Sequence, residues 1–437
     1  MVKKGKYNID SFYYIIQGKE MKKPELLAPA GSLDKAKIAF LYGADAIYAG
    51  TAKLSLRSRA ELNIDSLEQT CKYAHSIGKK VYVALNIYAH DEDYEAIEEE
   101  VKKLDFVGAD AIIASDVGVI ETIKKIAPNM EIHISTQANT VSLHSANFWY
   151  KYGAKRIILA RELSKDKIKY IMENKAQGLE VEMFVHGAIC YAYSGRCYLS
   201  KYLAGRCANL GDCAQPCRWQ YNITASEVNN PDSKIDLDFD EKGTYLFSSK
   251  DMCLIKQIPT IIDMGMDSLK IEGRLKTDYY LATVVRTYRQ AIDKYTELKI
   301  QGKESEYEPL KYLKELGKVK TRGLSEFYFS DEQNQDIHDL DGKSDNLEYE
   351  YGGKVIGVDI SDPKLTIIEI KNKLVLGDKL EILFNNGIEA KDFIINELYD
   401  IKTSEKIDHI NPGIKGQQVK IKLPCSVEPG IIIRRVK

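Results

Sequence analysis

The amino-acid sequence predicts an α/β protein: a (β/α)₈ TIM-like barrel with a cysteine-rich insertion after strand seven, followed by a small C-terminal all-β barrel domain. The first observation behind this is a recurring phrase in which a helix ends at Gly, turns, and enters a short apolar strand. It reads YGADAIYAG at 42–50, VGADAIIAS at 107–115, YGAKRIILA at 152–160 and MGMDSLKIEG at 264–273. The second observation is a change to closely spaced alternating strands from residue 349.

The apolar runs give eight strands for the barrel. They are expected at 25–28, 45–49, 80–85, 110–114, 131–135, 155–160, 180–185 and 268–272. Helical patterns such as LDKAKIAFLYG separate them. Eight alternating strand–helix units favour a closed barrel over an open doubly wound sheet. Because about eighty residues separate the last two strands, the seventh loop carries an insertion, at the barrel face where function is normally built.

The whole chain divides into consecutive segments. These are an N-terminal extension (1–21), a catalytic barrel (22–330) with its insertion (187–267), a linker (331–348) and a β-barrel domain (349–437). The extension lacks the long apolar region and the cleavage site of a signal peptide. The linker is polar and acidic, whereas the domain after it contains short strands with Gly, Asn and Asp turns.

Composition limits the functional classes. The net charge is −2 and 29% of the residues are charged, which is ordinary for a cytoplasmic protein. This balance neither requires nor excludes nucleic acid, because a local basic face can coexist with a neutral total. No run of about 18 apolar residues occurs, so we expect no transmembrane helix and no membrane partner. Cytoplasmic location is the expectation.

Five of the eight cysteines cluster at the start of the insertion. They are Cys190, Cys197, Cys207, Cys213 and Cys217. Without a secretory signal, a metal or redox centre explains them better than disulfides do. Thiolates suit zinc and an iron–sulfur cluster equally, although the wide Cys190–Cys197 spacing mildly favours a cluster. A third interpretation also stays open, in which a structural metal ion only holds the insertion together. The remaining three, Cys71, Cys253 and Cys425, are expected to be core residues.

The phrase EMFVHGAICYAYSGRCYLS matches the signature E-x-F-x-x-G-[SA]-h-C-x₄-G-x-C-x-h-S of the collagenase-like peptidase U (U32) family. LLAPAGS, HISTQAN, ILARELS, CAQPCRW and SLKIEGR also match, so the resemblance spans about residues 22–437. Members resemble oxygen-independent hydroxylases with a 4Fe–4S cluster and prephenate as hydroxyl donor. One branch makes 5-hydroxyuridine at the tRNA wobble position; others act on ribosomal RNA or quinone precursors. The resemblance implies Cys190, Cys197, Cys213 and Cys217 as cluster ligands and leaves out Cys207.

Polar residues follow the carboxyl ends of several predicted strands, where catalytic residues of barrels gather. His186, Arg161 and Glu162 are candidates for catalysis, His186 as an acid, a base or a hydrogen-bond donor. The substrate-binding candidates are Arg274, Glu272, Gln137, Asn86, Arg57 and Arg59. Arginines are natural anchors for the two carboxylates of prephenate. Alternatively, Glu162 and Glu272 pair with neighbouring arginines, and His186 only supports a metal ligand.

Three other functions stay open. A hydroxylase of ribosomal RNA or of a small aromatic would keep the cluster but leave tRNA untouched. A cysteine peptidase could use Cys190 with His186, but the neighbouring cysteines favour metal ligation, and the chain has no HExxH or GxSxG. The third is a noncatalytic protein that binds RNA as the partner of a second family member. The chain could also pair with a second copy of itself. SKYLAGRCANLG and RWQY mix cations with aromatics that suit RNA, although lysines on helices usually form a solvated face.

Overall fold

The computed structural model describes residues 13–16, 19–51, 62–221, 223–227, 230–237, 247–330, 337–339, 348–385, 389–413 and 416–437. Most of the predicted linker and the start of the N-terminal extension lie outside the described residues. Of the extension, two short strands pair antiparallel: β1 (Tyr13–Ile16) and β2 (Lys19–Lys22). No helix among the described residues combines the length and the apolar character needed to cross a lipid bilayer.

Eight parallel strands form the centre of the molecule and confirm the predicted (β/α)₈ barrel. They are β3 (Glu25–Pro29), β4 (Ala46–Gly50), β5 (Lys80–Ala84), β6 (Ala111–Ala114), β7 (Glu131–Ile134), β8 (Arg156–Ile158), β9 (Glu180–Ala188) and β13 (Ser268–Ile271). Each strand pairs in parallel with the next. β13 pairs with both β9 and β3, which closes the ring.

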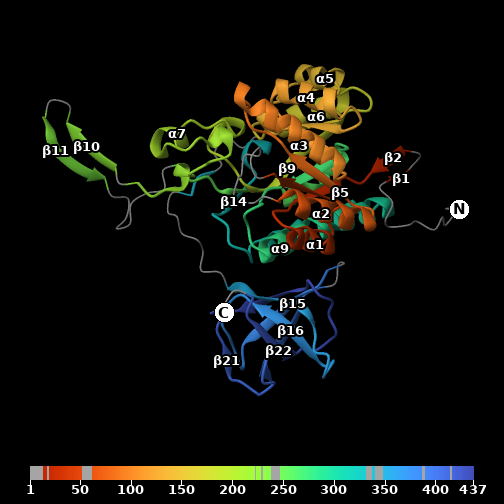
Figure 1. Ribbon diagram of the computed structural model, residues 1–437, viewed down its shortest axis with the longest axis vertical. Coiled ribbons are helices and arrows are strands. Elements are labelled where there is room, and N and C mark those ends of the chain that lie inside the picture. The colour runs from red at the N-terminus through yellow and green to blue at the C-terminus, as the bar shows by residue number, and fades with distance from the viewer. Residues whose placement is uncertain are drawn as a thin grey trace.

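Helices surround the strands, as Figure 1 shows. They are α1 (Leu33–Leu41), α2 (Ile64–Ser76), α3 (Tyr94–Phe106), α4 (Val117–Ile126), α5 (Leu143–Lys151), α6 (Lys165–Asn174), α8 (Ile258–Asp263) and α9 (Asp278–Gln301). Several begin where a side-chain oxygen accepts a backbone N–H, as Ser32 does for α1 and Thr277 for α9. Gly302, in the left-handed conformation, ends α9.

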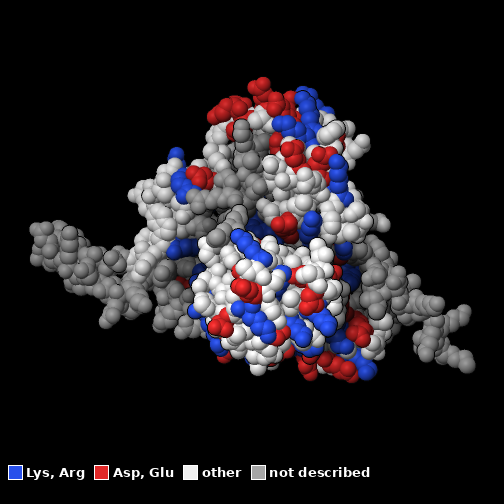
Figure 2. Space-filling model, turned by 60° about the horizontal axis from the view of Figure 1, so that its bottom comes forward, with Lys and Arg blue, Asp and Glu red and all other residues white. Residues whose placement is uncertain are grey.

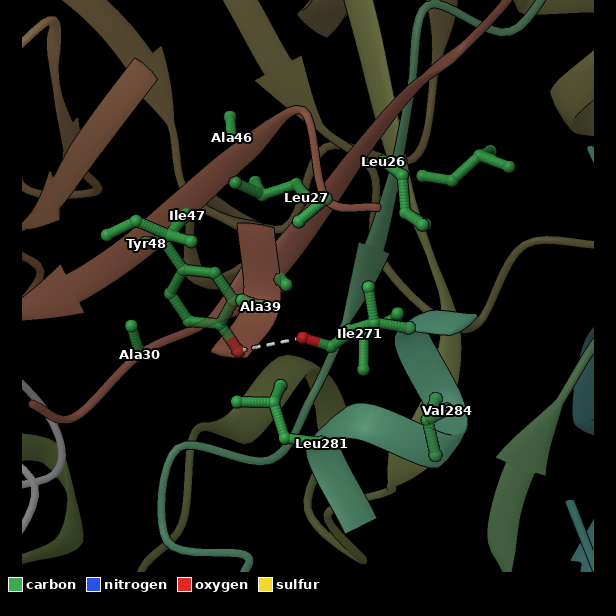
Figure 3. Close-up of a cluster of buried hydrophobic side chains, with 14 of the residues drawn as sticks. Leu26, Leu27, Ala30, Ala39, Ala46, Ile47, Tyr48, Ile271, Leu281 and Val284 are labelled. Atoms are coloured by element: carbon green, nitrogen blue, oxygen red, sulfur yellow. Dashed lines mark hydrogen bonds between the residues drawn. The ribbon is translucent and has the colours of Figure 1, made fainter. Parts of the chain in front are cut away.

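The hydrophobic core lies between the strands and the helices. Figure 3 shows part of it, where Ile271 of the barrel lies near Leu281 and Val284 of α9. These side chains are almost completely buried, so they supply the apolar contacts that hold the helix on the barrel. The hydroxyl of Tyr48 donates to the carbonyl oxygen of Ile271 at 3.0 Å and so ties β4 to β13 across β3.

The amino ends of the strands enclose a buried network of charges, which we call the barrel floor. Arg156 is 5% exposed and donates to three carboxylates: Glu25 at 2.6 Å, Glu180 at 2.8 Å and Glu182 at 3.1 Å. Lys270 donates to the other oxygen of Glu182 at 3.0 Å. Every charge in this network is therefore matched by an opposite charge in direct contact, which offsets the cost of removing it from water.

The insertion extends β9 beyond the predicted end at residue 185. A strand that was not predicted, β12 (Asp251–Cys253), pairs antiparallel with the end of β9 and in parallel with β14 (Leu324–Ser325). These added bonds explain why β9 continues to Ala188. The rest of the insertion holds the short helix α7 (Leu199–Ala204) and the hairpin of β10 (Ile223–Glu227) and β11 (Asn230–Leu237), which project to one side of the barrel (Figure 1).

The C-terminal domain is all-β, as predicted. Its sheet is antiparallel, with the order β19 (Lys391–Ile394), β18 (Lys379–Leu383), β23 (Ile432–Val436), β15 (Tyr349–Val358), β16 (Leu365–Ile370), β22 (Gln418–Lys422) and β20 (Leu398–Asp400). β17 (Leu374–Val375) pairs separately with β21 (His409–Ile410). Alternate residues of β16 are buried, which is the pattern of a sheet with one face on a core.

Polar contacts join this domain to the barrel helices. Tyr42 at the end of α1 donates to the carbonyl oxygen of Leu383 at 2.7 Å and accepts from the backbone of Ile432 at 2.9 Å. Arg434 is fully buried and binds Glu315 of α10 (Pro309–Leu316) at 2.8 Å as well as Glu381. The two domains are therefore held together by satisfied buried groups rather than by a linker alone.

Candidate functional site

A cavity of about 540 Å³ opens at the carboxyl ends of the barrel strands, beneath the insertion. From the barrel, its lining includes Tyr48, Asn86, Gln137, Arg161, Glu162, Phe184, Lys270, Glu272 and Arg274. From the insertion and the segment after the barrel, it includes Cys190, Tyr191, Tyr193, Cys197, Ala208, Cys213, Tyr328 and His338. This is the end of the barrel at which enzymes of this architecture hold their active sites.

The cavity brings together most of the predicted site residues. Asn86, Gln137, Arg161, Glu162, Glu272, Arg274, Cys190, Cys197 and Cys213 line it. His186 and Cys217 are not among the lining residues, and Arg57 and Arg59 lie outside the described residues. Residues more than 180 positions apart in the chain therefore meet at one end of the barrel, as the strand order predicts.

Two arginines approach the cavity from different strands. The guanidinium of Arg161, just after β8, donates to the carbonyl oxygen of Ala188 at 3.0 Å and lies 3.8 Å from the centre of the Phe184 ring. Arg274, after β13, is 4% exposed and lies 5.9 Å from the ring of Tyr48. The short distance to Phe184 restricts the guanidinium of Arg161, whereas Arg274 is held by its burial beside Tyr48; a guanidinium at either position suits a planar carboxylate.

An amide pair forms another wall of the cavity. Asn86 donates to Oε1 of Gln137 at 2.6 Å, and the backbone carbonyl of Gln137 accepts from Tyr88 and Arg196. Nε2 of Gln137 is buried and has no hydrogen-bond partner among the described residues. Because a buried N–H donor without a partner is costly, this amide is suited to donate to an oxygen of a bound molecule.

Glu162 holds the loop that carries the first two cysteines. Its Oε1 accepts from the backbone N–H of Ser194 at 2.6 Å, and its Oε2 accepts from the Ser194 hydroxyl at 3.1 Å. The same hydroxyl contacts Oδ1 of Asn139 at 2.9 Å. Ser194 has a φ of 47°, a left-handed conformation that costs energy for a residue other than glycine. Both oxygens of Glu162 therefore serve to fix the loop between Cys190 and Cys197.

The thiols of Cys190, Cys197, Cys213 and Cys217 influence one another electrostatically. Burial raises the pKa of Cys190, and the charges of Cys217 and Cys197 raise it further, although its side chain is open to the cavity. Burial also raises the pKa of Cys217, with Cys213 and Cys197 adding to the effect. No group of three or more His, Cys, Asp or Glu among the described residues is arranged to hold a metal ion.

The chemistry of these donors fits an iron–sulfur cluster. Thiols are the ligands that such clusters use, and backbone N–H groups commonly donate to their sulfurs. The backbone N–H of Gln215 donates to Sγ of Cys213 at 3.4 Å. A backbone hydrogen bond from Ala192 lowers the pKa of Cys190 against the larger opposing effect of burial. For Cys190 this contact favours the thiolate, which is the form that binds metal.

His186 lies in the barrel wall, where its ring contacts α9. Nδ1 is 3.4 Å from the hydroxyl of Tyr288, and the two ring centres are 5.5 Å apart. Burial lowers the pKa of His186 to about 4, so the ring is neutral near pH 7. The physical reason for its position is a bulge: β13 pairs Lys270 with Phe184 but Ile271 with His186, which skips one residue of β9. A one-residue shift turns the following side chain to the other face of the strand.

Sequence reasoning missed several residues of the cavity. Lys270 and Phe184 line it from neighbouring strands, and Tyr48 lines it from β4. The ammonium of Lys270 is 4.3 Å from the ring of Tyr48. A signal was available for Lys270, because a lysine two residues before Glu272 in the phrase SLKIEG shares the inward face of its strand. Tyr48 and Phe184 carried no such signal, since apolar strand residues are usually core.

Comparison with known proteins identifies the family. Residues 31–339 match peptidase family U32, and residues 348–434 match the peptidase family U32 C-terminal domain. The chain is 36% identical to tRNA hydroxylation protein P1 of Bacillus subtilis over 98% of this chain and 99% of that protein. It is 36% identical to tRNA hydroxylation protein P of Escherichia coli, over 84% and 87% of the two chains. Identity to a collagenase of Porphyromonas gingivalis is 30%, over 93% and 96%. The chain belongs to peptidase family U32.

Proposed function

We propose that this protein is a tRNA-modifying hydroxylase that forms 5-hydroxyuridine at the wobble position, with prephenate as hydroxyl donor and a 4Fe–4S cluster. Two relatives that match most of the chain carry the name tRNA hydroxylation protein, which supports RNA hydroxylation as the reaction. The observation that carries the proposal is the composition of the cavity, in which two guanidiniums face the same space as three thiols. The site of action is the cytoplasm, where tRNA is modified.

The arginines supply the binding site for prephenate. Arg161 lies against the ring of Phe184 and Arg274 lies near that of Tyr48, and each guanidinium can form paired hydrogen bonds with one of the two carboxylates. A cavity of about 540 Å³ lies within the usual range for small-molecule sites, roughly 300–1,000 Å³. The ketone and ring of prephenate would then extend toward Lys270 and the thiols, because those groups complete the lining.

The uridine enters the same cavity from outside. A base in a tRNA loop must leave its stack to reach an enclosed site, and polar groups then read its edge. Nε2 of Gln137 is oriented by Asn86 and is available to donate to a uracil carbonyl oxygen. Cys190, Cys197, Cys213 and Cys217 would hold the cluster, with Cys207 outside the ligand set. When bound, such a cluster supplies one-electron transfer or a Lewis-acidic iron.

An anaerobic assay tests the proposal. The full chain is purified without oxygen, analysed for iron and sulfide, and incubated with prephenate and tRNA from a strain that lacks the gene. Nucleoside mass spectrometry should show 5-hydroxyuridine only when prephenate, protein and iron are all present. Stoichiometric zinc in place of iron, or unchanged wobble uridine with a loaded cluster, would contradict it. If ribosomal RNA or a small aromatic is hydroxylated when it is supplied in place of tRNA, while tRNA stays unchanged, that molecule is the substrate instead.

A peptidase remains the second candidate because of the collagenase relative. The structure separates the two residues that this function would need. The ring of His186 packs against Tyr280 and Tyr288 of α9, whereas Cys190 lines the cavity. A nucleophile and its base must lie within hydrogen-bond reach. Cleavage of a labelled collagen peptide by iron-free protein, abolished by Cys190→Ser, would favour the peptidase.

A further inference from the structure

Helix α7 lies at the rim of the cavity. Cys197, two residues before the helix, lines the cavity, and so do Ala208 and Cys213, which follow it. The helix is therefore anchored on both sides by cavity-lining residues. A macromolecule that delivers a group to this cavity can therefore contact α7 at the same time.

The outer side of α7 exposes two large aromatic side chains. Tyr198 is 76% exposed and Tyr202 is 74% exposed. The backbone N–H of Tyr202 donates to the carbonyl of Tyr198 at 3.1 Å, which places the two residues one turn apart on the same side of the helix. Lys201 is exposed between them. We call these three residues the α7 face. Folding gains little from aromatic rings that stay this exposed, so their grouping points to a partner.

The charged residues around α7 indicate which class of partner would bind there. Residues 190–221 contain four cations, Arg196, Lys201, Arg206 and Arg218, against one carboxylate, Asp212, in a chain whose net charge is −2. Elsewhere the charges are mixed: on the C-terminal domain, the face shown in Figure 2 carries Lys and Arg interspersed with Asp and Glu. Clustered cations with exposed aromatics are the combination that binds unpaired nucleic acid, through phosphates and stacked bases.

We propose that the α7 face is the docking surface for single-stranded RNA next to the nucleotide that enters the cavity. Tyr198 and Tyr202 stack on flanking bases, and Lys201 contacts a phosphate. Tyr191 and Tyr193, about half exposed and part of the cavity lining, continue the aromatic path inward. This inference rests on the proposed function, because it assumes that RNA is the substrate. To that function it adds the protein surface on which the RNA binds and the requirement that the RNA is unpaired there.

Binding of a fluorescent anticodon stem–loop RNA to the cluster-loaded full chain tests the inference. The double variant Tyr198→Ala/Tyr202→Ala should raise the Kd at least tenfold, because each stacked base contributes about 1–3 kcal/mol. Tyr198→Phe/Tyr202→Phe keeps both rings and should stay within threefold of the wild type. The matched control is Lys103→Ala/Phe106→Ala, an exposed lysine and aromatic in the last turn of α3, at the opposite end of the barrel. It should leave the Kd unchanged.

Other results of this experiment show whether the proposed function or only the docking surface is wrong. If the wild type does not bind the stem–loop, the proposed function and this inference both fail. If the wild type binds and the alanine variant binds equally, only the inference is overturned. A wild type that prefers a fully paired duplex also overturns it. A dimer that is seen by sedimentation, and that the alanine variant disrupts without losing RNA affinity, also overturns it.

Lys201→Ala tests the phosphate contact independently. The slope of log affinity against log salt concentration should fall by about one in this variant. An unchanged slope counts against the phosphate contact.

Discussion

The two ends of the barrel use charged side chains in opposite ways. At the floor, Arg156 contacts three carboxylates and is almost completely buried. At the mouth, Arg161 contacts a neutral carbonyl and an aromatic ring and lines an open cavity. The same eight strands therefore carry an ion-pair network at one end and groups that line a cavity at the other, with Lys270 reaching from Glu182 of the floor to the cavity. Variants at the floor should change stability, and variants at the mouth should change activity.

The largest effect is expected at the floor. Arg156→Met leaves Glu25, Glu180 and Glu182 without their shared cation, and breaking a buried ion pair costs about 3–5 kcal/mol of unfolding free energy. Chemical denaturation of the full chain measures this. Lys155→Met is the matched control, because Lys155 lies next in the chain and reaches Glu180 at 3.6 Å from the surface; its loss should be below about 1 kcal/mol. Equal unfolding free energies of the two variants would show that the buried contacts of Arg156 stabilise the fold no more than a surface ion pair does.

At the mouth, Arg161→Lys keeps the charge but loses the planar fork that binds a carboxylate. We expect kcat/KM for prephenate to fall between about 10- and 100-fold, the size of one charge-assisted hydrogen bond. The unfolding free energy should change by less than about 1 kcal/mol, because lysine keeps the positive charge and most of the aliphatic stem of Arg161. A variant that unfolds readily but turns over normally when folded would place Arg161 with the floor residues.

His186 sharpens the comparison, because it lies near the mouth but faces the wall. Its pKa is lowered to about 4 by burial, so the unfolded chain binds the proton more tightly. Its contribution to stability is complete above about pH 6.5 and is lost as the pH falls toward 4; at pH 5 the loss is about 2 kcal/mol. In His186→Phe, the drop in unfolding free energy between pH 7 and pH 5 should shrink by that amount. An unchanged pH profile would show that the folded chain binds this proton as readily as the unfolded chain does, and so would contradict a lowered pKa of His186.

The smallest effect is expected for Glu162→Gln, which keeps the shape of the side chain but weakens its two hydrogen bonds to Ser194. A loss of about 1 kcal/mol in the loop should increase the rate of iron loss to a chelator about fivefold. Glu173→Gln on the exposed side of α6 is the control. If Glu162→Gln abolishes turnover while the iron stays bound at the normal rate, Glu162 acts on the substrate rather than on the loop.

The barrel could be predicted because its strands are short apolar runs between helices with Gly ends, and all eight were found. β12 could not, because Asp251 and Met252 form a strand only through pairing with the end of β9 and with β14. Such tertiary pairing leaves no periodicity in a stretch of three residues. The C-terminal domain was recognisable because β16 alternates buried and less buried residues along its length.

The site was predictable as far as strand order determines it. Arg161 and Arg274 follow strand ends, so they had to lie at the mouth. The orientation of His186 was not predictable, because it depends on the bulge near Val185. Gly187 is a partial signal: its φ is 110°, and a Cβ there would collide with the carbonyl oxygen of Glu272. A glycine directly after a histidine at a strand end therefore marks a local break in the alternation of inward and outward side chains.

Closure of the barrel by β13 sets the order in which the protein is completed on the ribosome. β13 is the neighbour of both β3 and β9, yet it follows Ala188 by about eighty residues. At roughly 5–20 residues per second, the ribosome needs about 4–16 s to supply them. The clustered cysteines, at 190–217, lie in the first part of this stretch, so they are synthesised while the wall beside them is still open. Assembly of the proposed iron–sulfur cluster on the nascent chain would therefore precede the last step of folding.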